Sequence, residues 1–196
     1  WANFPVLIAN YDFTQTVLEH KTQPYKIFNK GGLKIGVFGL GIELKGLVGE
    51  AQYQQTHYLE PIQIANATAS MLKRKEGCDM VICLSHLGYE YDGRKVSDMI
   101  LAKQSEHIDL IIGGHTHTFL EKPVQIKNLD DKNVLINQVG CFGINLGKID
   151  FYFSDEKIKE LHDLCIEVIN NPQKAEELLP THAGFFFGSY EYTVSI

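Results

Sequence analysis

Three histidines stand at the ends of two apolar runs, and their spacing is the clearest chemical signal in the sequence. His86 follows M-V-I-C-L-S, whereas His115 and His117 follow L-I-I and two glycines. A neutral imidazole offers a borderline-soft nitrogen that suits zinc, manganese, iron, nickel or cobalt, and glycine permits the turn that carries two rings toward one cavity. An isolated H-x-H is more often a pair of polar loop residues. The third histidine favours a metal site, because three imidazoles at one sheet edge are poorly explained by chance.

The runs before these histidines predict a parallel strand unit. A strand is expected at 79–85, a helix around 96–106 and a second strand at 109–113. A strand, a helix and a strand in that order form two parallel strands joined by a right-handed crossover. Ligands of such sheets gather beyond the carboxyl ends of the strands, which is where all three histidines fall.

Further elements are expected on both sides of this unit. A helix is predicted from Pro61, which suits a first helical turn, to Gly77, which ends it. Residues 157–169, after a turn at 154–156, fit either a helix or a strand, and the adjacent turn favours a hairpin. Short apolar or alternating runs bounded by turn residues predict strands at 6–9, 33–41, 134–140, 147–153 and 190–196.

Composition excludes several classes of partner. The 196 residues are 44% hydrophobic, which is enough for one domain with a sizeable core. The formal charge is −6 and no basic run is longer than residues 73–75, so a nucleic-acid partner is not expected. The apolar runs are far shorter than the ~20 residues of a membrane helix, so no membrane span is expected. The sequence starts at Trp1 without a basic and apolar leader, which indicates that a signal peptide is already removed or lies outside it.

The remaining histidines and the cysteines carry no recognisable motif. We expect the other histidines to be surface or solvated residues, and the cysteines to be buried thiols rather than a disulfide or metal set, because no C-x-x-C pair occurs. These residues are His20, His57, His107, His162 and His182, and Cys78, Cys83, Cys141 and Cys165.

Several motifs together resemble a known family. C-L-S-H-L-G, I-I-G-G-H-T-H-T and Q-V-G-C-F-G-I-N-L-G-K-I resemble the calcineurin-like metallophosphoesterases, specifically the 5'-nucleotidase branch, and F-P-V-L-I-A-N-Y and K-I-G-V-F-G-L are similar to it as well. The resemblance implies an α/β fold, part of a four-layer α/β/β/α sandwich with mixed sheets. Residues 1–153 would be the C-terminal portion of the metallophosphoesterase domain, and 154–196 a β-rich extension of the same domain.

The resemblance also implies a two-metal site. His86 and His115 would bind one divalent ion and His117 the other, with zinc, manganese, cobalt, nickel or iron as the candidate metals. The family's Asp-x-His, Gly-Asp and Gly-Asn-His-Glu motifs supply the bridging aspartate, the other ligands and the transition-state histidine, and they normally precede F-P-V-L-I-A-N. No catalytic residue is therefore expected in this chain, and the first half of the domain is expected upstream of it.

The implied activity is hydrolysis of a small phosphoester, such as a nucleotide, by the intact domain. The chain alone is expected to be inactive, to self-associate through an exposed sheet surface, and to come from a protein exported to the periplasm or cell surface. The alternative is a non-catalytic remnant of the fold that binds one metal or none. A nucleophilic hydrolase is a weaker third hypothesis, because the sequence lacks a G-x-S-x-G elbow.

Overall fold

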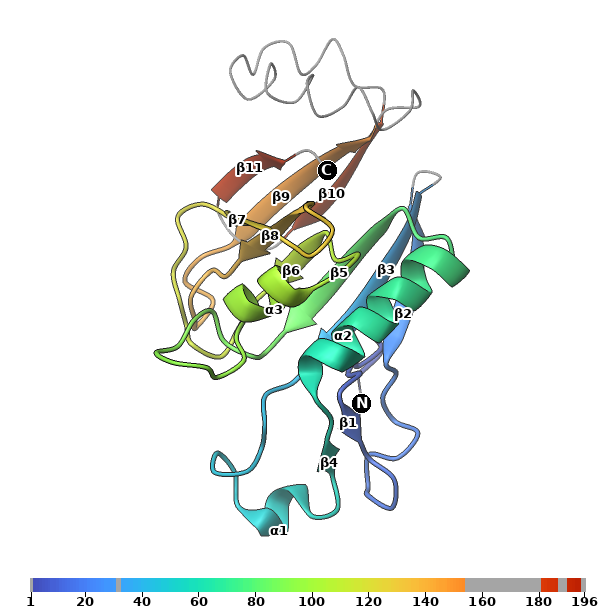
Figure 1. The fold of residues 1–196 in the computed structure, drawn as a ribbon, viewed down its shortest axis with the longest axis vertical. Helices are drawn as coiled ribbons and strands as arrows, with labels where there is room; N and C mark the ends of the chain where they lie inside the picture. The colour runs from blue at the N-terminus through green and yellow to red at the C-terminus, as the bar shows by residue number, and fades with distance from the viewer. Residues whose placement is uncertain (1, 31–32, 154–180, 187–189, 195–196) are drawn as a thin grey trace.

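A six-stranded mixed sheet forms the centre of the computed structural model, which describes residues 2–30, 33–153, 181–186 and 190–194. The strand order is β2-β3-β5-β6-β8-β7 (Figure 1). The four inner strands run parallel, and β2 and β7 pair antiparallel at the two edges. The bounds are Tyr25–Lys30 for β2, Leu33–Leu40 for β3, Met80–Ser85 for β5, Leu110–Ile112 for β6, Val124–Lys127 for β7 and Asn133–Asn137 for β8.

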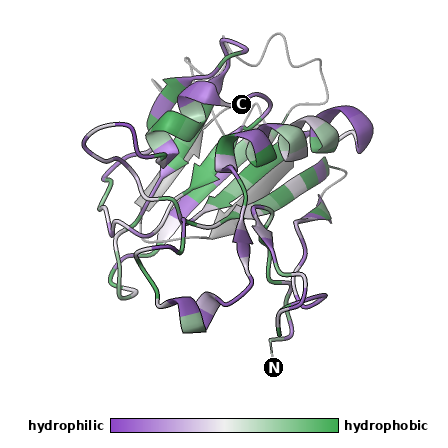
Figure 2. Ribbon diagram, turned by 60° about the horizontal axis from the view of Figure 1, so that its bottom comes forward, coloured by the Kyte–Doolittle hydropathy of each residue, from purple (hydrophilic) through white to green (hydrophobic). Residues whose placement is uncertain are grey.

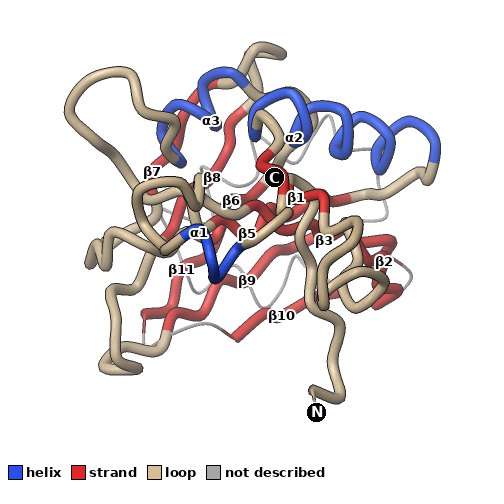
Figure 3. Tube along the Cα trace, turned by 90° about the horizontal axis from the view of Figure 1, so that it is seen from below, coloured by secondary structure: helices blue, strands red, loops and turns tan. Residues whose placement is uncertain are grey.

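Helices cover one face of this sheet (Figures 1 and 3). They are α2 (Pro61–Ser70), its continuation as the π-helix η1 (Met71–Lys75), and α3 (Asp98–Gln104). The carboxylate of Glu60 caps α2 by accepting from the Gln63 N–H at 2.7 Å, and Gly77 ends the helical segment with φ +69°. Ala65, Ala69 and Leu72 are fully buried at a spacing that places them on one helical face.

A second, three-stranded sheet packs on the other face, as Figure 3 shows. Its strands are β9 (Gly147–Phe153), β10 (Thr181–Phe186) and β11 (Tyr190–Val194), with β9 in the middle. Ile149 and Phe151 of β9 are buried in one hydrophobic cluster with residues of the central sheet. The described residues thus supply the helical layer and both sheets of the expected sandwich, and the predicted α/β class with mixed sheets is confirmed.

Successive residues of the central strands pack into two different hydrophobic clusters, one on each face of the sheet. In β5, Val81 and Cys83 belong to the cluster that contains the helices, whereas Met80 and Ile82 belong to the cluster between the two sheets. Successive side chains of a strand point to opposite faces, and both faces of this sheet are covered. The inner strands are therefore apolar along nearly their whole length, as the hydropathy colours of Figure 2 show.

A small two-stranded unit projects from the sandwich on the side of β3 (Figure 1). It pairs β1 (Tyr11–Asp12) with β4 (His57–Tyr58), and α1 (Glu50–Tyr53) lies on the connection before β4. Asn10, which is fully buried, ties the unit to the end of β3. Its amide donates to the Gly41 carbonyl and accepts from the Gly41 N–H, both at 2.8 Å.

The structure corrects one expected strand and leaves two other predictions outside its range. Residues 6–9 form no strand and make one isolated bridge, between Leu7 and Gln23. The segment also lies close to β3, since a Cβ on Gly39 would be 2.0 Å from the Leu7 carbonyl oxygen and the Ala9 N–H donates to the Gly39 carbonyl at 2.8 Å. The turn at 154–156 and the hairpin at 157–169 lie outside the described residues, and the division of the domain after residue 153 stays a prediction.

His107 is a partly buried surface residue. Its side chain is only 14% exposed, because it lies between two polar partners. Nε2 accepts from the Arg74 side chain at 3.1 Å, and Nδ1 lies 3.3 Å from the Asp130 carboxylate.

Cys78 and Cys83 are buried free thiols as expected. Within the described residues, no helix is long and apolar enough to cross a membrane.

Candidate metal centre

The first histidine is positioned by the end of β5. The His86 N–H donates to the Leu40 carbonyl at 2.8 Å, which continues the pairing with β3 by one residue. The Ser85 hydroxyl accepts from the Leu87 N–H at 3.2 Å and donates to the carboxylate of Asp98 at 2.5 Å. These two bonds fix the backbone on both sides of His86.

The second histidine follows β6 after two glycines whose packing requires glycine. A Cβ on Gly113 would lie 2.3 Å from Oδ2 of Asp98. A Cβ on Gly114 would lie 3.0 Å from Nδ1 of His86, so this imidazole rests against the Gly114 backbone. The two glycines thus allow the loop before His115 to pass directly beneath the ring of His86.

The structure brings two of the three predicted ligands together. The ring centroids of His86 and His115 are 5.2 Å apart, with an angle of 71° between the ring planes. The ring of His117 instead contacts the Phe142 ring edge-on, with 5.9 Å between centroids. His86 and His117 are exposed, and His115 is half-buried.

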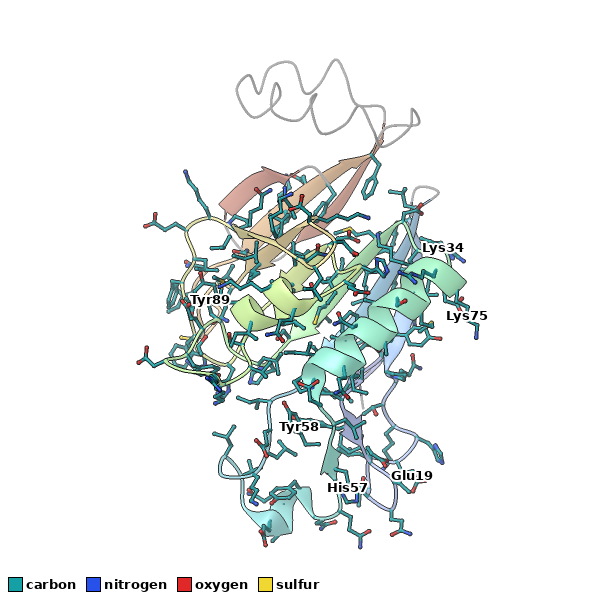
Figure 4. The ribbon with its side chains drawn as sticks, in the orientation of Figure 1. Glu19, Lys34, His57, Tyr58, Lys75 and Tyr89 are labelled. Atoms are coloured by element: carbon teal, nitrogen blue, oxygen red, sulfur yellow. The ribbon has the colours of Figure 1, made fainter. Side chains whose placement is uncertain are left out.

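Thr116, which lies between the two loop histidines, is hydrogen-bonded to two other segments. The Thr116 hydroxyl accepts from the Tyr89 N–H at 3.0 Å and donates to Oε1 of Gln138 at 3.2 Å. Tyr89, labelled in Figure 4, lies on the loop that follows β5, so Thr116 joins the two histidine-bearing loops. His115 and His117 both adopt left-handed backbone conformations, with φ of +70° and +54°. Such conformations are uncommon for residues other than glycine, and here they flank a threonine anchored on both sides.

Electrostatics favours an uncharged imidazole at His115. Partial burial, followed by the charges of His86, Lys95 and His117, lowers the pKa of His115. The neutral imidazole is the form that binds metal. Deeper in the protein, burial raises the pKa of the fully buried Asp98 to about 7, although the Ser85 hydrogen bond acts in the opposite direction.

A cavity of about 590 Å³ opens beside the histidine pair. His86 and His115 form part of its wall together with Ser85 and Tyr11, and most of the remaining wall is aliphatic. The aliphatic residues are Leu7, Ile8, Leu40, Ile42, Leu44, Leu47, Val48, Leu84 and Ile112. The arrangement is thus a largely apolar cavity with two adjacent metal-binding side chains at the strand ends.

The described residues fit part of a metal coordination sphere. The two adjacent imidazoles suit zinc, nickel, cobalt or iron, which accept nitrogen ligands. A structural or catalytic site of such an ion usually has three or four protein ligands. In the part of the chain that the structure describes, no group of three or more His, Cys, Asp or Glu side chains is placed to bind one ion.

The chain has clear relatives, although no protein-family model matches it. The 5'-nucleotidase of Vibrio cholerae serotype O1 is 33% identical over 142 residues, which are 68% of this chain and 25% of that protein. The apyrase of Tabanus yao is 31% identical over 167 residues, or 77% of this chain and 29% of that protein. The structure of the calcineurin-like phosphoesterase YfkN from Bacillus subtilis covers 95% of this chain and 56% of its own, with a TM-score of 0.58 and 21% identity.

The fold is that of the calcineurin-like phosphoesterases, a class of metal-dependent hydrolases. Within this class the chain belongs to the 5'-nucleotidase branch, to which its sequence relatives point. It spans between 25% and 29% of the length of the two relatives named above.

Sequence reasoning missed the residues that support the histidines. Ser85, Asp98 and Gln138 are buried polar residues, and their hydrogen bonds fix the two loops. Two of them carried a readable signal, since Ser85 immediately precedes His86 and Gln138 follows the next parallel strand, β8. Asp98 lies at the start of a helix, where an acidic residue is ordinary, so its sequence position gives no sign of this role.

Proposed function

We propose that this chain supplies one side of the metal site of a phosphoric ester hydrolase that acts on nucleotides or other phosphomonoesters. In this proposal His86 and His115 bind one divalent ion, and His117 binds a second. The observation that supports it best is the contact between the His86 and His115 rings at the ends of two neighbouring parallel strands. Zinc, manganese, cobalt, nickel and iron are the candidate metals.

The described residues would bind and orient rather than react. A pair of divalent ions, when bound, supplies a water of lowered pKa and a clamp for the phosphoryl oxygens. His86 and His115 would present imidazole nitrogens to this site, at the wall of an open and largely aliphatic cavity. The remaining ligands and the catalytic groups would come from a part of the protein outside these 196 residues.

The metal proposal is tested first by titration of the 196-residue chain with Co²⁺, followed by absorption and calorimetry. We expect the wild-type chain to bind Co²⁺, and His86→Ala and His115→Ala to weaken binding at least ~10-fold, since each removes a direct ligand. His57→Ala is the matched control, because His57 is exposed on β4, well away from Tyr89 in Figure 4. Equal Co²⁺ affinity in all four proteins would contradict the proposed site.

The hydrolase proposal is tested by turnover of p-nitrophenyl phosphate and AMP with Mn²⁺ or Co²⁺. The 196-residue chain should turn over little or nothing, because preorganised groups around the transferred phosphoryl normally supply most of the rate. A longer protein that includes the upstream motifs should be active, and His117→Ala should then remove most of its activity. Brisk turnover by the short chain would refute the incomplete-site proposal, and an inactive longer protein would refute the hydrolase assignment.

One observation favours a second candidate, a non-catalytic remnant of the fold that binds one metal or none. Among the described residues, no three potential ligands are placed to bind one ion. A remnant would show at most one weakly bound Co²⁺ per chain, and no activity after extension. The same two assays therefore separate the candidates.

Self-association and export complete the proposal. Phe119, Phe142, Ile144 and Leu146 are 50–88% exposed apolar residues of the loops that follow β6 and β8, and such surfaces promote pairing with a second copy. Light scattering that gives a monomer at all concentrations would contradict self-association.

We also propose export of the protein to the periplasm or cell surface, by family resemblance, and fractionation of the producing cells would test this.

A further inference from the structure

We propose that Gln138 is a positioning residue that, through Thr116, sets the distance between the two histidine-bearing loops. This inference rests on the proposed metal site and adds to it the residues that hold the ligands in place. Gln138 is 1% exposed and directly follows β8, the strand beside β6. Its side chain therefore approaches the loop after β6 from inside the protein.

Both ends of the Gln138 amide are bonded to the loop that carries His115 and His117. Nε2 donates to the Gly114 carbonyl at 2.8 Å, before the first histidine. Oε1 accepts from the Thr118 N–H at 2.5 Å, after the second histidine. One side chain thus spans the whole H-T-H segment, and this requires a donor and an acceptor at fixed separation. Glutamine supplies both, whereas a carboxylate supplies acceptors only.

Thr116 extends this support to the loop that carries the first histidine. Its hydroxyl donates to Oε1 of Gln138 at 3.2 Å and accepts from the Tyr89 N–H at 3.0 Å. The Thr118 hydroxyl oxygen lies 2.9 Å from the Thr116 hydroxyl oxygen. A hydrogen-bonded chain therefore runs from Gln138 through Thr116 to the backbone after β5. Among the described residues no other side-chain hydrogen bond joins the two loops, so this chain is their polar link beside the packing of His86 on Gly114.

The experiment measures the histidine pair directly in the metal-free 196-residue chain. Histidine labelled with ¹³C gives a nuclear Overhauser effect between the His86 and His115 rings, whose centroids are 5.2 Å apart. Gln138→Glu keeps the size of the side chain but places an oxygen against the Gly114 carbonyl. Thr116→Val removes the hydroxyl and keeps the shape, and Thr116→Ser restores the hydroxyl.

A matched control makes the same amide-to-carboxylate change elsewhere on the same sheet. Asn128 is 8% exposed in the turn between β7 and β8, and its Oδ1 accepts from the Asp130 and Lys132 N–H groups at 2.9 Å. Its Nδ2 has no hydrogen-bond partner among the described residues. Asn128→Asp therefore loses no hydrogen bond, and it should leave the histidine pair unchanged.

The expected result is loss of the ring-to-ring signal in Gln138→Glu and Thr116→Val, and its retention in Thr116→Ser and Asn128→Asp. Co²⁺ affinity should fall about 10-fold in the first two variants only. A full-strength signal in Gln138→Glu and Thr116→Val would overturn the positioning role, as would its loss in the Asn128 control. A wild-type chain that gives the signal but binds no Co²⁺ would refute the metal site and leave the positioning role supported by the variants.

Discussion

Replacing Asp98 with asparagine tests whether burial raises the pKa of this carboxyl group, which lies against the loops that carry the histidines. Asp98 is fully buried, with Oδ1 bonded to the Ser85 hydroxyl and Oδ2 without a partner among the described residues. Burial raises its pKa from 3.8 to about 7. The folded protein therefore retains a proton that the unfolded chain has lost between about pH 4 and pH 7. Linkage then requires the free energy of unfolding contributed by Asp98 to fall as the pH rises through this window.

The size of the effect follows from the two pKa values. Each unit between them corresponds to about 1.4 kcal/mol, so the full loss from acid to alkaline pH is about 4 kcal/mol. Asparagine cannot ionise and can still accept from Ser85. We expect the Asp98→Asn variant to gain about 2–3 kcal/mol over the wild type between pH 5 and pH 8.

Urea denaturation of both proteins at pH 5, 6, 7 and 8 measures this difference, because ionisations common to both proteins cancel. Asp92→Asn is the control, since it removes an exposed carboxylate from the loop between β5 and α3 and should change stability by less than about 0.5 kcal/mol. A difference between Asp98→Asn and wild type that stays constant with pH would refute the reasoning. It would mean that Asp98 remains ionised when buried.

Two further predictions concern the framework. Lys73→Met should lower the free energy of unfolding by about 2 kcal/mol in urea denaturation, because it leaves the mostly buried Asp109 carboxylate without the ammonium 2.7 Å away; an unchanged midpoint would contradict this. Gly113→Ala should lower it by about 1–3 kcal/mol, because the new methyl group meets the Asp98 carboxylate at 2.3 Å. Gly49→Ala is the control, since its nearest neighbour would be 3.8 Å away and φ is −64°. Thermal unfolding compares the two glycine variants, and equal melting temperatures would refute the packing argument.

The parallel unit around the site was predictable because its signals are local. Apolar runs that end in His86 and in Gly113-Gly114, with a helical segment between them, match β5, α3 and β6 within one or two residues. The proximity of His86 and His115 follows from this unit, because neighbouring parallel strands end at the same edge. That the two rings make contact could not be predicted, since it depends on the close packing of Gly114 on His86 and of Gly113 on Asp98.

Other parts depended on contacts that a single segment does not encode. Residues 6–9 have the composition of a strand, but they form only an isolated bridge to Gln23 and one hydrogen bond to Gly39 of β3. The edge strands β2 and β7 are only partly apolar, because one face or end of each is solvated, so their runs gave no clear signal. Gln138 contacts the H-T-H segment only once the register between β6 and β8 is set.

The succession of β5 and β6, which are neighbouring strands in the sheet and are joined through α3 along the chain, has a consequence for the order of folding. Contacts between near neighbours in sequence close short loops and form with the smallest entropic barrier. We expect amides of β5 and β6 to gain protection in pulsed hydrogen exchange before the pairing of β3 with β5, which must close the long connection from 41 to 79. The two imidazoles would then meet while the segments that later wall the cavity are still unfolded. A metal ion present at that moment could bind the histidine pair before the rest of the cavity wall has formed.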